Sequence, residues 1–119
     1  MTTRMLAKSE WQSYCDKISK VLKAQQAQID ILGLAIGDQK LIGQWVPFLG
    51  IVYDHKDDLL EIALEGLDHM ILKPREVYVD FNVGGLIGLA VIDSDHVRQI
   101  IKLKEPVALP VPEPAEPSL

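Results

Sequence analysis

The helical period of hydrophobic residues occurs once in this chain, close to its start, and this most limits the folds that the chain can adopt. Apolar residues recur at steps of three and four in a stripe made of Trp11, Tyr14, Cys15, Ile18, Val21 and Leu22. Polar residues take the opposite face, and Ser9-Glu10-Trp11-Gln12 has the form of a capping box. The pattern predicts one amphipathic helix that starts near Ser9.

Beyond Gln28 the chain changes to short apolar or alternating segments separated by turn residues, which is typical of β-strands. We expect strands within residues 29–36, 40–53, 59–65, 76–81, 86–92 and 97–103, and a hairpin turn at Gly84-Gly85. The last segment also fits a short helix capped by Asp95. Residues 1–104 are therefore predicted to form a single α+β domain, in which the N-terminal helix packs on a curled, mostly antiparallel sheet of about six strands.

Residues 105–119 differ in composition from the rest of the chain. They contain five of the seven prolines, at Pro106, Pro110, Pro112, Pro114 and Pro117, and no aromatic residue. Such a segment is typical of a flexible, polyproline-like tail. Its Pro-Val-Pro-Glu-Pro also fits a ligand for a proline-reading domain, although a solvated tail is the favoured interpretation.

Three of the expected strands are apolar on nearly every residue, whereas a strand with one face in water alternates. One helix of about 15 residues is about 22 Å long, and six strands side by side span roughly 24 to 29 Å, so the helix covers only part of one face. Either the sheet curls on itself into a barrel-like shape, or a second copy covers it as a two-fold dimer. If a dimer forms, we expect its contact at Trp45, Val46, Phe48 and Leu49, because aromatic residues concentrate in interface cores.

Charge and composition exclude several classes of function. The net charge of −5 disfavours nucleic acid as a partner, since such binding depends on cationic contacts. No apolar run is long enough to cross a membrane, and the first ten residues lack the apolar stretch of a secretory signal, so we expect a cytoplasmic protein. Cys15 lies on the apolar stripe of the helix and is expected to be buried and unreactive.

The densest group of chemically active residues is Asp54-His55-Lys56-Asp57-Asp58, between two expected strands. Three carboxylates and an imidazole fit a divalent metal site with Asp54, His55, Asp57 and Asp58 as ligands. Acidic residues also serve the backbone of a turn, and Lys56 opposes a cation, so the turn interpretation is favoured.

Two further groups raise the same choice between structure and chemistry. Asp93-Ser94-Asp95-His96 repeats the acidic turn, and His69 follows Asp68 in an expected loop, where a carboxylate could orient a general base. No nucleophile motif or glycine-rich phosphate loop accompanies them. We therefore expect no cofactor and a structural role for His69.

These residues together resemble a family of short bacterial proteins classed only as a domain of unknown function. The resemblance covers most of positions 3–110 and rests on Thr3-Arg4 with Trp11, Ile36-Gly37-Asp38-Gln39, Gly50-Ile51, Tyr53-Asp54, Asp57-Asp58, Leu60-Glu61-Ile62, Asp68-His69 with Ile71 and Pro74, Val77-Tyr78-Val79-Asp80, Ile92-Asp93-Ser94-Asp95 and Gln99-Ile100-Ile101. It implies a hairpin at residues 93–96, where the family has a turn glycine that His96 replaces, and hence a strand at 97–103. It implies no activity.

The sequence thus favours a non-catalytic bacterial accessory or protein-interaction domain that associates with itself, with neither nucleic acid nor a membrane as partner. The alternative is a protein that binds a small ligand or a divalent metal, or a hydrolase, through the Asp54–Asp58 loop and His69.

Overall fold

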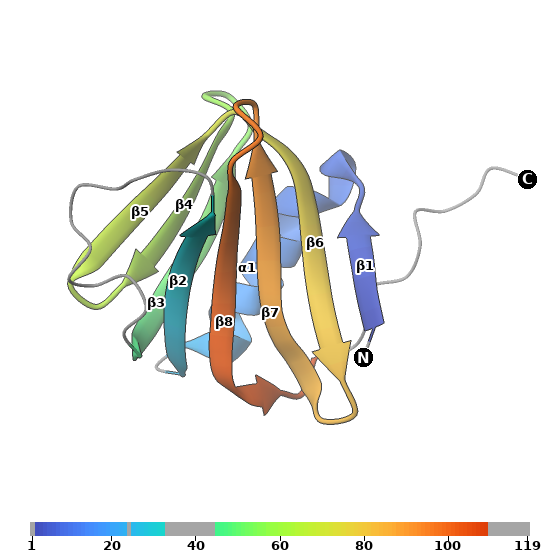
Figure 1. The fold of residues 1–119 in the computed structure, drawn as a ribbon, viewed down its shortest axis with the longest axis vertical. Helices are drawn as coiled ribbons and strands as arrows, with labels where there is room; N and C mark the ends of the chain where they lie inside the picture. Colours follow the sequence, from blue (N-terminus) through green and yellow to red (C-terminus); the bar gives the residue numbers. More distant parts are fainter. Residues whose placement is uncertain (1, 24, 33–44, 110–119) are drawn as a thin grey trace, which may run out of the picture.

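A computed structural model describes residues 2–23, 25–32 and 45–109, and these form one α-helix and eight strands (Figure 1). In chain order the elements are β1 (Thr2–Leu6), the 3-10 turn η1 (Lys8–Glu10), α1 (Trp11–Leu22), β2 (Gln26–Leu32), β3 (Val46–Asp54), β4 (Leu59–Leu64), β5 (Leu67–Leu72), β6 (Pro74–Asn82), β7 (Gly85–Asp93) and β8 (Arg98–Val107). The sheet order is β1-β6-β7-β8-β2-β3-β4-β5, and every neighbouring pair is antiparallel.

The core lies on the inner face of this sheet, where α1 packs. Buried residues alternate with more exposed ones along β4, β6 and β8, so each of these strands turns one set of side chains inward. The helix contributes five buried residues of the predicted stripe, whereas Val21 is 39% exposed. Trp11 contacts Tyr53 of β3 edge to face, with ring centroids 5.1 Å apart. The amphipathic helix and its packing on a mostly antiparallel sheet are confirmed.

The pairing between β2 and β3 is short: within the described residues two pairs join the strands, Gln26 with Pro47 and Ala27 with Val46. Beyond this point α1 lies against β3. The Ser19 hydroxyl donates to the carbonyl of Ile51 at 2.8 Å and accepts from its N–H at 2.9 Å. One side chain of the helix therefore satisfies backbone groups of β3 that no β2 residue pairs with.

The expected number of strands is wrong, because the described residues form a sheet of eight strands rather than about six. The sequence prediction missed β1, which has one buried residue, Leu6. It also missed β5, where His69 interrupts an inward-facing series that begins with Leu67 and ends with Ile71, so the segment reads as a loop. The sheet is not barrel-like either, since β1 and β5 are its two edges and do not pair with each other.

Several local predictions are confirmed, and the predicted start of the helix is wrong. The hairpin at Gly84-Gly85 joins β6 and β7, and the final segment is a strand, β8, that continues through residues 105–107. The helix begins through η1 rather than a box at Ser9, and the Glu10 carboxylate accepts from the N–H of Ala7 at 2.9 Å. Residues 33–44 and 110–119, which include parts of two expected strands and most of the expected tail, lie outside the described residues. No helix within the described residues is long and apolar enough to span a membrane.

Candidate functional site

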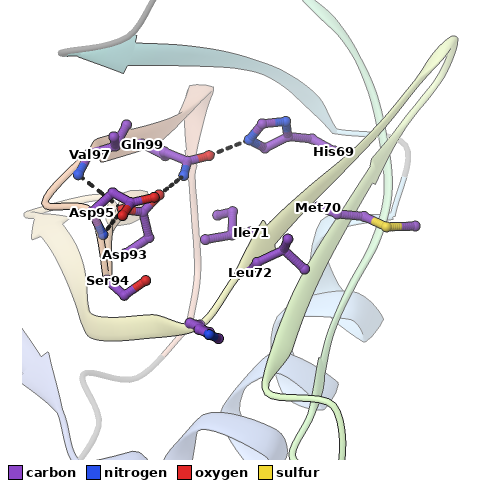
Figure 2. A pocket seen from close by; sticks show the side chains of 10 residues that line it. His69, Met70, Ile71, Leu72, Asp93, Ser94, Asp95, Val97 and Gln99 are labelled. Atoms are coloured by element: carbon purple, nitrogen blue, oxygen red, sulfur yellow. Dashed lines mark hydrogen bonds between the residues drawn. The ribbon is translucent and has the colours of Figure 1, made fainter.

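A pocket of about 420 Å³ opens between β5 and the hairpin that joins β7 to β8 (Figure 2). One wall is formed by β5 and the residue after it, His69, Met70, Ile71, Leu72 and Lys73. The other is formed by the β7–β8 hairpin, through Asp93, Ser94, Asp95, Val97 and Gln99. His69 pairs in register with the buried Ile62 of β4, so its side chain lies on the inner face of the sheet. The curl of the sheet then brings it opposite β8, which is four places away in the sheet order.

A chain of hydrogen bonds connects His69 to the hairpin through Gln99 (Figure 2). The Gln99 amide nitrogen donates to Asp93 Oδ2 at 3.0 Å, and its oxygen Oε1 contacts His69 Nε2. A carboxylate only accepts, so Asp93 fixes which end of the amide faces it, and Gln99 Oε1 must accept the proton of His69 Nε2. Neutral His69 therefore carries its proton on Nε2, and Nδ1 is left as an acceptor.

Asp93 holds this chain in place because it also organises the hairpin. Its Oδ1 atom accepts from the N–H of Asp95 at 2.9 Å and of Val97 at 3.0 Å. The turn needs a left-handed residue, and His96 takes that conformation with φ of 63°. The hairpin that the family resemblance implied at residues 93–96 is confirmed, and the backbone explains why a glycine suits position 96.

Lys73 joins this hairpin to the turn between β3 and β4. Its N–H donates to the carbonyl of Asp58 at 2.8 Å, and its own carbonyl accepts from the N–H of Ser94 at 3.0 Å. Lys73 and Asp58 both have positive φ, of 51° and 50°. Three turns thus meet at one end of the sheet, beside the pocket, in backbone conformations that L-residues adopt at a cost.

The predicted metal-binding loop forms the turn between β3 and β4, and its carboxylates make local contacts. Asp54 Oδ1 accepts from the N–H of Lys56 at 2.9 Å and of Asp57 at 3.4 Å. Asp58 Oδ1 accepts from the Tyr53 hydroxyl at 2.8 Å, and burial, together with this bond, raises the pKa of Tyr53 to about 12. His55 is exposed. Within the described parts of the chain, no three His, Cys, Asp or Glu side chains gather in a way that could hold a metal ion.

The outer face of the sheet, opposite α1, carries a second arrangement that we call the β6–β8 face. Cross-strand register places Glu76, Ile92 and Arg98 in one row and Tyr78, Ala90 and Ile100 in the next. A third row contains Asp80, Gly88 and Lys102. The outward residues of β7 are thus apolar, and they separate an acidic column on β6 from a basic column on β8.

Hydrogen bonds hold both carboxylates of the acidic column. The Tyr78 hydroxyl donates to Glu76 Oε1, a contact that raises the pKa of Tyr78. The Thr3 hydroxyl donates to Asp80 Oδ1 at 2.6 Å. Figure 1 shows α1 behind the sheet, and none of the described helices or strands lies in front of β6, β7 and β8.

The residues expected at a dimer contact lie at the start of β3 and just before it. Trp45 is 40% exposed and Leu49 is 50% exposed, and Val46 is partly buried. Phe48 is fully buried in the protein's own core. Cys15 is buried as predicted, and its burial, followed by the charge of Asp16, raises the pKa of the thiol to about 12.

Sequence reasoning placed His69 in a loop and did not identify Gln99 as its partner. The signal was present, because Gln99 interrupts the inward series of Val97, Ile101 and Leu103 in the predicted last strand. A single amide in an apolar series, 5% exposed in the structure, needs a hydrogen-bond partner. The identity of that partner depends on the curl of the sheet, which local sequence does not contain.

Comparison with known proteins gives similarity without an activity. Residues 2–112 match a family described as a family of unknown function, DUF5335. The chain is 38% identical over 114 residues to an uncharacterised protein of Aquifex aeolicus (strain VF5), an alignment that covers 95% of this chain and 100% of that protein. No solved structure matches.

Proposed function

The chain belongs to the family of unknown function DUF5335, and because that membership brings no activity with it, we propose from the geometry that the protein is a non-catalytic interaction domain that works as a homodimer. The observation that carries this proposal is the β6–β8 face. Its central strand presents Ala90 and Ile92 outward, and Ile100 adjoins them on β8. These side chains are only partly buried, although they lie in the middle of a sheet.

Burial of this surface against a second copy stabilises the pair, because removal of apolar area from water contributes roughly 25 cal/mol per Å². A homodimer also explains why β7 is apolar on nearly every residue. Apolar side chains on both faces of the strand are stabilised only if each face of the sheet is shielded from water. The helix side of the sheet supplies the first covering from within the chain, and a partner supplies the second.

The experiment is the mass in solution by light scattering over a range of protein concentrations. The proposal predicts a species of about 27 kDa, twice the chain mass of 13.3 kDa, that dissociates on dilution. Ala90→Lys, which places charge at the centre of the face, should shift the mass to that of a single chain. The matched control Val52→Lys, on the half-exposed outward side of β3, should leave the mass unchanged. A single-chain mass at every wild-type concentration would refute the proposal.

A different observation favours a second function, the binding of a small ligand in the pocket beside His69. The Asp93–Gln99 pair fixes the ring of His69, and an oriented ring with a free Nδ1 acceptor on a wall of about 420 Å³ is an arrangement that binding sites use. A ligand that binds only the folded state raises the melting temperature.

This second function predicts that a fragment library contains compounds that raise the melting temperature of the wild type and not of His69→Ala. Divalent ions belong in the same screen, since the sequence also suggested a metal site at Asp54, His55, Asp57 and Asp58. A shift that His55→Ala abolishes and His69→Ala leaves intact would assign the ligand to the β3–β4 turn instead.

A further inference from the structure

We propose that the second copy sits on the β6–β8 face with the two-fold axis parallel to β7, so that β6 of each chain lies over β8 of the other. This inference rests on the proposed homodimer and adds its geometry. An isologous dimer brings the same surface of both copies together, so each residue must suit the residue that the symmetry places opposite it. The position of the charged columns decides which symmetry the face permits.

An axis along β7 exchanges the two sides of the face and keeps each row at its own height. The row of Glu76, Ile92 and Arg98 then sets each glutamate opposite the partner's arginine, with the two Ile92 side chains facing each other. Two rows further along the strands, Asp80 lies opposite the partner's Lys102 in the same way. Both acidic residues of the β6 column therefore meet a cation, on both sides of the apolar centre.

The other in-plane axis, across the strands, leaves each column over its own copy. Glu76 and Asp80 would then face acidic residues of the partner, and Arg98 and Lys102 would face basic ones. Like charges brought together at an interface cost several kcal/mol. The charge pattern therefore selects one of the two ways in which identical sheets can stack face to face.

The dimensions of the sheet agree with a stable contact. The five strands from β1 to β2 contain 5, 9, 9, 10 and 7 residues in sheet order. At about 3.3 Å per residue and ~4.8 Å per strand, they cover about 630 Å² per copy. Interfaces of standard size bury about 800 Å² per partner. Stacked sheets rotate by about 30°. Glu76 and Arg98 lie about 8 Å from the centre at Ala90, ~4.8 Å across the strands and ~6.6 Å along them, so the rotation moves them by about 4 Å, within the reach of Glu and Arg side chains.

Charge exchange between Glu76 and Arg98 tests the geometry, with dimer dissociation constants measured by analytical ultracentrifugation and folding checked by circular dichroism. Glu76→Arg alone and Arg98→Glu alone should each weaken the homodimer about 30-fold, or about 2 kcal/mol at about 1.4 kcal/mol per tenfold, because two attractive pairs become repulsive. The double variant should return to within about threefold of wild type. An equimolar mixture of the two single variants should form a heterodimer. Glu76→Arg has arginine at both positions and Arg98→Glu has glutamate at both, so every pair between the two chains is attractive.

The outcomes separate this inference from the proposed function. A wild type that is monomeric at every concentration refutes both. A wild-type dimer that neither single variant weakens, or whose single variants do not associate when mixed, refutes the axis along β7 and leaves the homodimer standing. Dissociation by Trp45→Ala or Leu49→Ala, with the charge variants intact, would move the contact to β3. If Glu76→Arg does not fold, the same exchange between Asp80 and Lys102 repeats the test.

Discussion

Replacement of Gln99 by leucine should destabilise the protein by about 2 kcal/mol. Leucine keeps most of the side-chain volume, so the change removes the amide and leaves packing in β8 largely intact. Asp93 Oδ2 then loses its donor at 3.0 Å, and hydrogen bonds to charged groups are worth about 1.5–3 kcal/mol. His69 is only partly buried and can turn to water, so its lost contact adds little.

The assay is urea denaturation followed by circular dichroism, with Gln12→Leu on the exposed face of α1 as the control. Surface changes of that kind stay within about 0.5 kcal/mol. Nitrogen NMR provides an independent readout, because the neutral ring of wild-type His69 should favour the Nε2–H tautomer and should lose this preference in Gln99→Leu. A free energy of unfolding for Gln99→Leu within about 0.5 kcal/mol of wild type would refute the role assigned to the hydrogen-bond chain.

Three further predictions follow from the backbone and the helix. A Cβ at Gly88 would lie 2.5 Å from the Ile101 carbonyl oxygen, so Gly88→Ala should lower the free energy of unfolding by about 1–3 kcal/mol in urea denaturation. The control Gly50→Ala, whose added Cβ would have its nearest contact at 3.8 Å, should stay within about 1 kcal/mol of wild type. His96→Gly should raise the unfolding free energy by about 0.5–1 kcal/mol, because φ is 63° there, and an unchanged or lower value would contradict the left-handed turn. Burial raises the pKa of the Cys15 thiol from 9.0 to about 12, so as pH rises the unfolded chain loses the thiol proton before the folded chain does, and the free energy of unfolding falls between those two values. Cys15→Ala should reduce the fall of the urea midpoint over this pH range, and an identical slope in the variant would contradict the prediction.

The parts of the fold that sequence predicted are those that local pattern encodes. The stripe from Trp11 to Leu22 marked the helix, alternation marked β4 and β6, and glycines marked the β6–β7 turn. Edge strands were missed because an edge needs few buried residues, and β1 has only Leu6 to show. The number of strands therefore came out too low.

The candidate site was predictable in its parts and not in its assembly. His69 and the acidic hairpin were both singled out, but their connection through Gln99 spans 30 residues from β5 to β8. That contact depends on the curl of the sheet across β2, β3 and β4, where pairing between β2 and β3 is short and Ser19 of the helix bonds the β3 backbone instead. The charged columns of the β6–β8 face likewise depend on register, which no single strand contains.

The most direct test of the account is a cross-linking measurement at Ala90, which the proposed axis places opposite its own copy. Stacked sheets lie about 10 Å apart, so a short bismaleimide rather than a disulfide should join two Ala90→Cys chains, while the buried Cys15 stays unreactive. We predict a covalent dimer for Ala90→Cys and none for Leu72→Cys, because Leu72 is 67% exposed but lies on the edge strand β5, away from the β6–β8 face. Efficient cross-linking at Leu72 with none at Ala90 would contradict it.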